Sequence, residues 1–115
     1  MKIYTSYFGN FKNFPKDAVP IGITRFPPEG VLNVRMCAPS EALLKKYKNK
    51  EIDEFMFSIM FKDELKKRFR EPEKLLDLLE LISNGHDIVL CCYEKTGEFC
   101  HRQVLRDWLN AGTEI

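Results

Sequence analysis

The chain has 115 residues, of which 44% are hydrophobic and 30% are charged, which is ordinary for a soluble globular protein. Its 18 basic and 17 acidic residues nearly cancel, so the charge balance gives no reason to expect a nucleic-acid or membrane partner. No segment approaches the roughly 20 apolar residues that a membrane span needs, and residues 1–7 do not resemble a signal peptide. We therefore expect one cytoplasmic domain that spans 1–115.

The chain carries four cysteines, which are Cys37, Cys91, Cys92 and Cys100. In a cytosolic protein these are expected to be reduced thiols. Cys91 and Cys92 are neighbours on an expected strand, where successive side chains point to opposite faces of the sheet. These two cysteines are therefore not expected to pair with each other.

The first third of the chain predicts two strands. Residues 2–8 are rich in aromatic and β-branched side chains, as in a strand, whereas residues 9–17 have the glycine, asparagine and proline content of a loop. A second strand is expected over 21–24, and the pair Pro27-Pro28 stops it. Residues 31–37 fit either a short edge strand or an extended loop.

From Ser40 onward, the spacing of the apolar residues changes to that of helices. Ser40 is expected to be the N-cap of a first helix, on which Leu43, Leu44 and Tyr47 share one face. A second helix is expected to run on to Phe69. Its apolar residues recur at helical spacing, at Ile52, Phe55, Met56, Ile59 and Met60.

A third helix is predicted to open at Pro72, a residue that is tolerated in a first turn, and to end at Asn84-Gly85. Its core face is expected to consist of Leu75, Leu78, Leu79 and Ile82. The continuous apolar run over 88–93 follows it. Such a run predicts a strand that is buried on both faces, as in a parallel sheet.

A loop containing Gly97 is expected over 94–99, and a last helix follows it and is closed by Gly112. The apolar stripe of this helix is expected at Val104, Leu105, Trp108 and Leu109. Strands near both ends, with helices between and after them, predict an α/β fold. We expect a single small domain with a mostly parallel, Rossmann-like sheet flanked by helices.

Polar residues lie at the end of each expected strand. Ser6 ends the first strand, Arg25 follows the second, and Glu94 follows the strand over 88–93. In open parallel sheets, ligands bind beyond the carboxyl ends of the strands. If the strands are parallel, these three side chains crowd one rim of the sheet, and they are candidate ligand-binding residues there.

The tripeptide Cys100-His101-Arg102 opens the last helix and is expected at the same rim. Unpaired backbone N–H groups and the helix dipole favour an anion at such a position. Arg102, together with Arg25, is predicted to bind a small anionic ligand such as a phosphate or a nucleotide. Cys100 and His101 are the candidate nucleophile and acid/base of an enzyme acting on that ligand.

Each residue of the tripeptide also has a structural alternative. Cys100 can be a small buried cap, and His101 can bond a backbone carbonyl or face solvent. Arg102 can bond buried carbonyls or Glu94, which would lock the last helix onto the sheet. In that case the chain is a non-catalytic interaction module.

A further alternative is a thiol or metal site built on Cys92, Cys100 and His101, with His86 upstream. The spacing is not C-x-x-C, and adjacent Cys and His side chains usually diverge, so the set fits structural zinc poorly. We expect no metal and no cofactor.

Two basic clusters lie on expected helices that also carry acidic residues, so they are expected to be solvated helix faces. They consist of Lys45, Lys46, Lys48 and Lys50, and of Lys66, Lys67, Arg68 and Arg70. The sequence has no G-x-G-x-x-G, P-loop, G-x-S-x-G or H-E-x-x-H motif.

The segment over 89–95, which reads V-L-C-C-Y-E-K, is followed by E-F-C-H-R over 98–102. Together they resemble the bacterial, archaeal and phage family called domain of unknown function 488. Its members have a late strand ending near C-Y-E, a short loop, C-H-R and a helix with a late W-L, which Trp108-Leu109 matches here. The segment over 21–27 resembles the family's earlier strand, and the helix after Pro39 also fits its short members.

This resemblance implies an α/β sandwich related to Rossmann-like folds. It maps the family's motif onto Arg25, Cys92, Glu94, Cys100, His101 and Arg102. One departure is Cys91, which stands where a leucine is commoner in the family. The resemblance supplies no reaction, because the family's name states that none is established.

Overall fold

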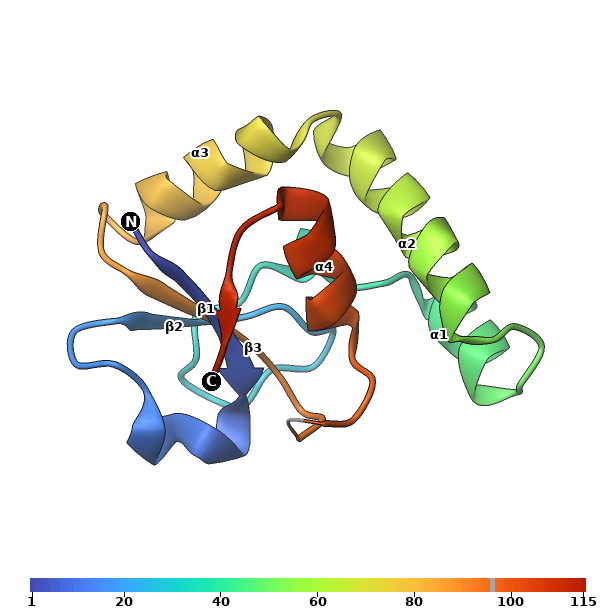
Figure 1. Ribbon diagram of the computed structural model, residues 1–115, viewed down its shortest axis with the longest axis horizontal. Helices are drawn as coiled ribbons and strands as arrows, with labels where there is room; N and C mark the ends of the chain where they lie inside the picture. The colour runs from blue at the N-terminus through green and yellow to red at the C-terminus, as the bar shows by residue number, and fades with distance from the viewer. Residues whose placement is uncertain (96) are drawn as a thin grey trace.

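The computed structural model describes residues 1–95 and 97–115, and its centre is a four-stranded sheet in the order β2-β3-β1-β4 (Figure 1). The strands are β1 (Ile3–Tyr7), β2 (Val19–Gly22), β3 (Ile88–Cys92) and β4 (Thr113–Glu114). Each pairing between them is parallel. The predicted α/β fold with a parallel sheet is therefore confirmed. Residue 96, within the loop expected over 94–99, lies outside the described residues.

Three of the four strands were predicted, although β2 has different bounds and β4 was not expected. All five residues of β3 are buried, as expected of a central parallel strand. β2 begins two residues before its expected start, because Val19 already pairs with Ile88 of β3. The short strand β4 was not predicted. It pairs with β1 and places Glu114 beside Thr5 in the register.

The helices are α1 (Glu41–Lys48), α2 (Glu54–Phe69), α3 (Pro72–Ile82) and α4 (His101–Leu109), with short 3₁₀ helices η1 (Phe8–Asn13) and η2 (Arg35–Cys37). The predicted N-cap is confirmed, since Ser40 Oγ accepts from the Leu43 N–H at 3.2 Å. The prediction of a loop over 9–17 is wrong for the first half of that range, where η1 forms. The last helix ends at Asn110, a left-handed cap with φ of 53°, rather than at Gly112.

The hydrophobic core lies between the sheet and the four α-helices, which Figure 1 shows arching over one side of the sheet while η1 lies on the other. Ile88, Leu90 and Cys92 of β3 point into this core, because alternate residues of a strand share a face. Among the described residues, no helix is long and apolar enough to span a membrane.

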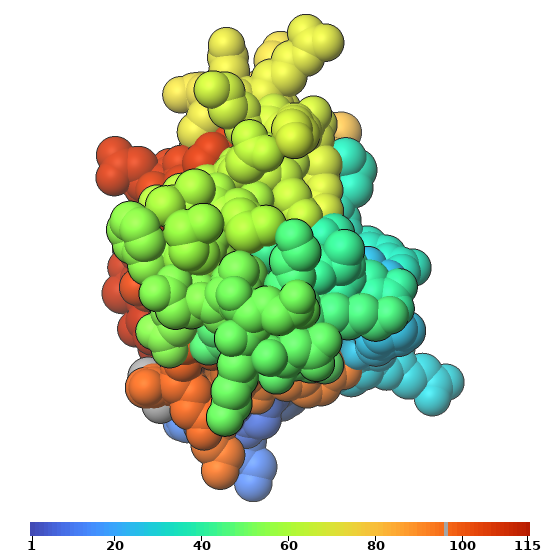
Figure 2. Space-filling view, turned by 90° about the vertical axis from the view of Figure 1, so that its right-hand side faces the viewer, coloured from blue at the N-terminus to red at the C-terminus, as the bar shows by residue number. Residues whose placement is uncertain are grey.

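The predicted apolar spacing on α2 is wrong for Phe55, Met56 and Ile59, which are exposed, whereas Ile52 and Met60 pack against the core. The buried residues of α2 are Phe57, Phe61, Leu65 and Phe69. Phe55 is 70% exposed and Ile59 is 48% exposed. This helix carries two apolar stripes, and only its packing against α4 and α1 decides between them. Figure 2 shows the face of the molecule that α1 and α2 cover.

Candidate functional site

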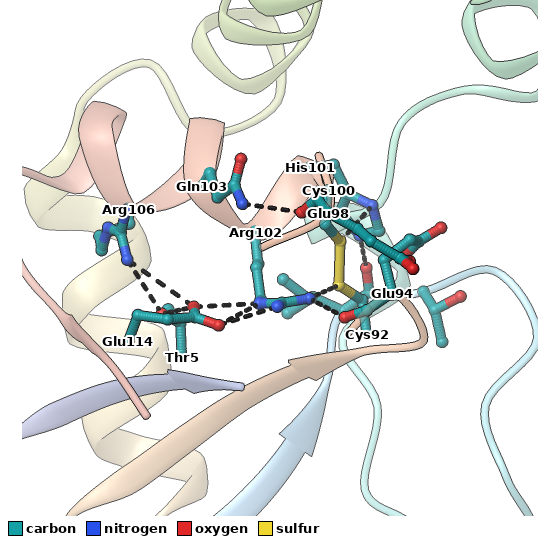
Figure 3. The surroundings of a disulfide bond; sticks show 12 residues. Thr5, Cys92, Glu94, Glu98, Cys100, His101, Arg102, Gln103, Arg106 and Glu114 are labelled. Atoms are coloured by element: carbon teal, nitrogen blue, oxygen red, sulfur yellow. Dashed lines mark hydrogen bonds and ion pairs between the residues drawn. A yellow bond between two sulfur atoms is a disulfide. The ribbon is translucent and has the colours of Figure 1, made fainter. Parts of the chain in front are cut away.

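A disulfide joins Cys92 at the end of β3 to Cys100, the N-cap residue of α4 (Figure 3). The prediction of reduced thiols is therefore wrong for this pair. It failed because the sequence gives no sign that the chain after β3 returns α4 to the end of the same strand. Cys37 and Cys91 are free and buried, so Cys91 and Cys92 do not pair with each other, as predicted.

Arg102 lies completely buried behind this disulfide, with 0% of its side chain exposed. Its Nη1 donates to the Glu94 carbonyl at 2.7 Å and to Cys92 Sγ at 2.9 Å. Its Nη2 donates to Glu114 Oε2 at 2.8 Å, and Nε faces the same carboxylate at 3.1 Å. These are the contacts of the structural alternative, in which the arginine holds α4 to the sheet.

Glu114 is the partner of Arg102 that sequence reasoning missed. Thr5 Oγ1 donates to Glu114 Oε1 at 2.7 Å, and Arg106 lies 3.7 Å from the same oxygen (Figure 3). The carboxylate thereby ties β4 to β1 and to α4. A glutamate in a two-residue strand has no periodic pattern around it, so the sequence offered no signal beyond the neighbouring β-branched Thr113.

His101 points from the first turn of α4 toward the end of β2, where its Nε2 meets the backbone oxygen of Ile23. A carbonyl oxygen only accepts, so Nε2 carries the hydrogen and Nδ1 keeps a lone pair. Nδ1 lies 3.7 Å from Cys100 Sγ. Burial lowers the pKa of His101 below its ordinary value of 6.5, which favours the neutral ring at pH 7.

A pocket of about 400 Å³ opens beside His101 at the carboxyl ends of β2 and β3. Its lining residues are Thr24, Arg25, Phe26, Ala38, Pro39, Glu41, Leu44, Lys45, Lys48, Cys92, Tyr93, Glu94 and His101. The side chain of Arg25 is 21% exposed there, and its Nη2 lies 3.8 Å from Glu41 Oε2. Three cations and two carboxylates therefore face the pocket, together with the half-buried His101 ring.

The predicted site residues fall into three places. Arg25, Glu94 and His101 line the pocket together, as the rule for parallel sheets leads one to expect. Arg102 does not line the pocket, but it contacts Cys92, which does. Ser6 is buried elsewhere, donating to the Ile115 carbonyl at 2.9 Å.

The position of Ser6 follows from the alternation of β1. Ser6 pairs in register with Cys91, whereas Thr5 pairs with Leu90 on the helix-covered face. Neighbouring residues of a strand point to opposite faces, so Ser6 points away from the face on which Thr5 bonds Glu114.

Sequence reasoning also missed the contribution of α1 to the pocket. Glu41, Lys45 and Lys48 line it, although the lysines were interpreted as part of a solvated helix face. They are exposed, as that interpretation predicts, yet they stand over the ends of β2 and β3. Only the tertiary structure, in which α1 and the ends of β2 and β3 line the same pocket, shows that these lysines face it.

A sequence model of the family described as "Active DUF488-N3 subclade" matches residues 3–113. The match covers both the pocket and the disulfide. Comparison with curated proteins and with solved structures gives no match.

Proposed function

The chain belongs to the DUF488 family, in the subclade described as active DUF488-N3, and we propose that it binds a small anionic ligand in the pocket beside His101. The ligand class is phosphate- or nucleotide-like. The observation that carries the proposal is Arg25, whose side chain is only 21% exposed and lines the pocket beyond the carboxyl end of β2.

The charges around the pocket support an anion. Lys45 and Lys48 add two flexible cations from α1 to the guanidinium of Arg25. Glu41 offsets part of this charge, but it is exposed and lies 3.8 Å from Arg25, near the limit of an ion pair. Such an exposed pair contributes about 1 kcal/mol or less, so a phosphate making bidentate hydrogen bonds competes with it favourably.

The disulfide between Cys92 and Cys100 favours ligand binding over covalent catalysis in the pocket. Neither sulfur is a thiolate while Cys92 and Cys100 are bonded, so Cys100 can act as a nucleophile only after reduction. His101 Nδ1 and the Glu94 carboxylate can accept hydrogen bonds from a ligand, whereas the Nε2–H of His101 already donates to the Ile23 carbonyl. Because the subclade is described as active, His101 is our candidate acid/base.

The contacts of Arg102 favour a second candidate function, a non-catalytic interaction module in which the tripeptide is structural. Arg102 bonds a backbone carbonyl and a carboxylate, and it does not line the pocket. This alternative predicts no small-molecule ligand in the pocket.

Both candidates are tested by binding measurements on the oxidised protein in the presence of a chelator. Inorganic phosphate, nucleotides and sugar phosphates are screened by thermal shift, and any binder is measured by calorimetry. A ligand at 100 times its Kd should stabilise the fold by about 2.7 kcal/mol. Arg25→Ala should weaken binding by about 10- to 100-fold, since a hydrogen bond to a charged group contributes about 1.5–3 kcal/mol.

Arg35→Ala is the matched control, because Arg35 is exposed and does not line the pocket. It should bind as the wild type does. If no anion shifts the melting temperature, or if Arg25→Ala binds every anion as well as the wild type, the proposal is wrong and the interaction module is favoured.

A further inference from the structure

The ring nitrogen of His101 and the sulfurs of Cys92 and Cys100 form a compact donor cluster. The three donor atoms lie within 4.8 Å of one another. In a tetrahedral zinc site, with Zn–S of about 2.3 Å and Zn–N of about 2.0 Å, a sulfur and a nitrogen ligand are about 3.5 Å apart. His101 Nδ1 lies 3.7 Å from Cys100 Sγ, so this pair already has the required separation.

The orientation of His101 also suits a metal ligand. Its Nε2–H donates to the Ile23 carbonyl, which leaves the Nδ1 lone pair on the side of Cys100 Sγ. Histidines that bind metals almost always donate their other ring N–H in this way, because the hydrogen bond fixes both the tautomer and the ring. Adjacent Cys and His side chains were expected to diverge, but the first turn of α4 brings them together.

In the reduced protein, the groups that contact the two sulfur atoms would stabilise them as thiolates. Arg102 Nη1 donates to Cys92 Sγ at 2.9 Å, and Cys100 is the N-cap of the nine-residue helix α4 (Figure 3). Both a guanidinium and a helix N-terminus favour negative sulfur. Two thiolates balance the charge of a divalent ion, so a metal here would not leave an uncompensated charge in the core.

We propose that the reduced protein binds one Zn²⁺-class divalent ion through Cys92 Sγ, Cys100 Sγ and His101 Nδ1. Cys92 and His101 line the pocket, so the fourth coordination position opens into it. Three protein ligands and an open position are the arrangement of catalytic zinc sites rather than structural ones. This site does not depend on the proposed anion binding, since none of its ligands is Arg25, Lys45 or Lys48.

Metal binding requires the disulfide to be opened. With a phosphine as reductant, the phosphorus takes an oxygen atom from water and becomes a phosphine oxide. Its two electrons break the S–S bond, and the two hydrogen atoms of that water complete two thiols. Zn²⁺ then displaces one proton from each thiol, so two protons are released for each ion bound.

The test is a titration of phosphine-reduced, metal-free protein with Co²⁺ under anaerobic conditions, followed by Zn²⁺. We expect one Co²⁺ per chain, the absorption of tetrahedral thiolate-bound cobalt, displacement by Zn²⁺ and release of two protons per ion. The oxidised protein should show none of these. Absence of the cobalt spectrum in the reduced protein, or a stoichiometry well below one, would overturn the proposal.

Variants assign the ligands. Cys92→Ser, Cys100→Ser and His101→Ala should each weaken Co²⁺ binding by more than about 100-fold, which exceeds the 10- to 100-fold cost of changing an outer contact. Cys91→Ala is the matched control, because its thiol is on the same strand but faces the opposite side of the sheet. Binding that survives the three ligand variants but is lost in Cys91→Ala would place the metal elsewhere.

A measurement on the wild type covers the case in which a variant fails to fold. Zn²⁺ should protect Cys92 and Cys100 of the reduced protein from alkylation, as located by peptide mass spectrometry. Equal alkylation with and without Zn²⁺ would overturn the proposal. Arg25→Ala should keep full metal binding, so failure of the anion proposal and failure of the metal proposal give different results.

Discussion

Replacing Glu114 by glutamine should destabilise the protein strongly, although the residue lies in a two-residue strand. The variant leaves the guanidinium of Arg102, which is 0% exposed, without its carboxylate partner. Removing one partner of a buried ion pair lowers the free energy of unfolding by about 3–5 kcal/mol. We expect about 3 kcal/mol, because Arg102 keeps its bonds to the Glu94 carbonyl and to Cys92 Sγ.

The assay is urea unfolding followed by the fluorescence of Trp108, the single tryptophan of the chain. Its ring lies 6.3 Å from that of Phe69, so its emission should change when α4 leaves α2. A loss of about 3 kcal/mol corresponds to a decrease in melting temperature of about 12 °C for a domain of this size. Arg106→Met is the control, because its contact with Glu114 is 3.7 Å long and partly exposed. It should cost about 1 kcal/mol or less.

The double variant Arg102→Met with Glu114→Gln tests the reasoning itself. If the loss in Glu114→Gln comes from an uncompensated buried charge, removing that charge should restore part of the stability. The double variant is therefore expected to be more stable than Glu114→Gln alone. The reasoning would be refuted if Glu114→Gln were no less stable than Arg106→Met. It would also be refuted if the double variant were less stable than Glu114→Gln.

Two further predictions concern the core. Phe61→Ala should lose about 3–5 kcal/mol of unfolding free energy, whereas Phe55→Ala on the exposed face of α2 should change it by about 0.5 kcal/mol or less; equal losses in urea unfolding would contradict the assigned face. Burial raises the pKa of the Cys37 thiol from 9.0 to about 12, so its stabilising contribution is complete below pH 9 and decreases as the pH rises toward 12. The stability difference between wild type and Cys37→Ala should therefore shrink from pH 8 to pH 10.5, and a difference independent of pH would contradict this.

The elements that sequence predicts well are those whose pattern is local. Ser40 followed by helical spacing gives the start of α1, and the unbroken apolar run gives β3 with both faces buried. α2 shows the limit of this reasoning. Apolar residues occupy two of its faces, and the choice of Phe57 and Phe61 over Phe55 and Ile59 is made by the helices α1 and α4 against which α2 packs. Periodicity within one helix contains no information about those neighbours.

The candidate site divides in the same way. Arg25 and Glu94 follow strands, and the parallel sheet alone brings them to one rim, so they could be predicted. Glu114 could not, because its role depends on β4 pairing beside β1, and a two-residue strand leaves no pattern to detect. The disulfide was missed for a related reason. Compartment and spacing argued for reduced thiols, whereas the pairing depends on the path of the chain between Cys92 and Cys100.

The tripeptide Cys100-His101-Arg102 makes three different connections from the start of α4. Cys100 joins β3 through the disulfide, His101 reaches the backbone just after β2, and Arg102 holds the carboxylate of Glu114 on β4. One helix end is thus fixed to β3, to β4 and to the backbone that follows β2. This explains how a single motif supports both a structural and a functional interpretation. Arg102 holds α4 to β4, while Cys92 and His101 line the pocket, so we expect stability and the proposed ligand binding to respond to different substitutions.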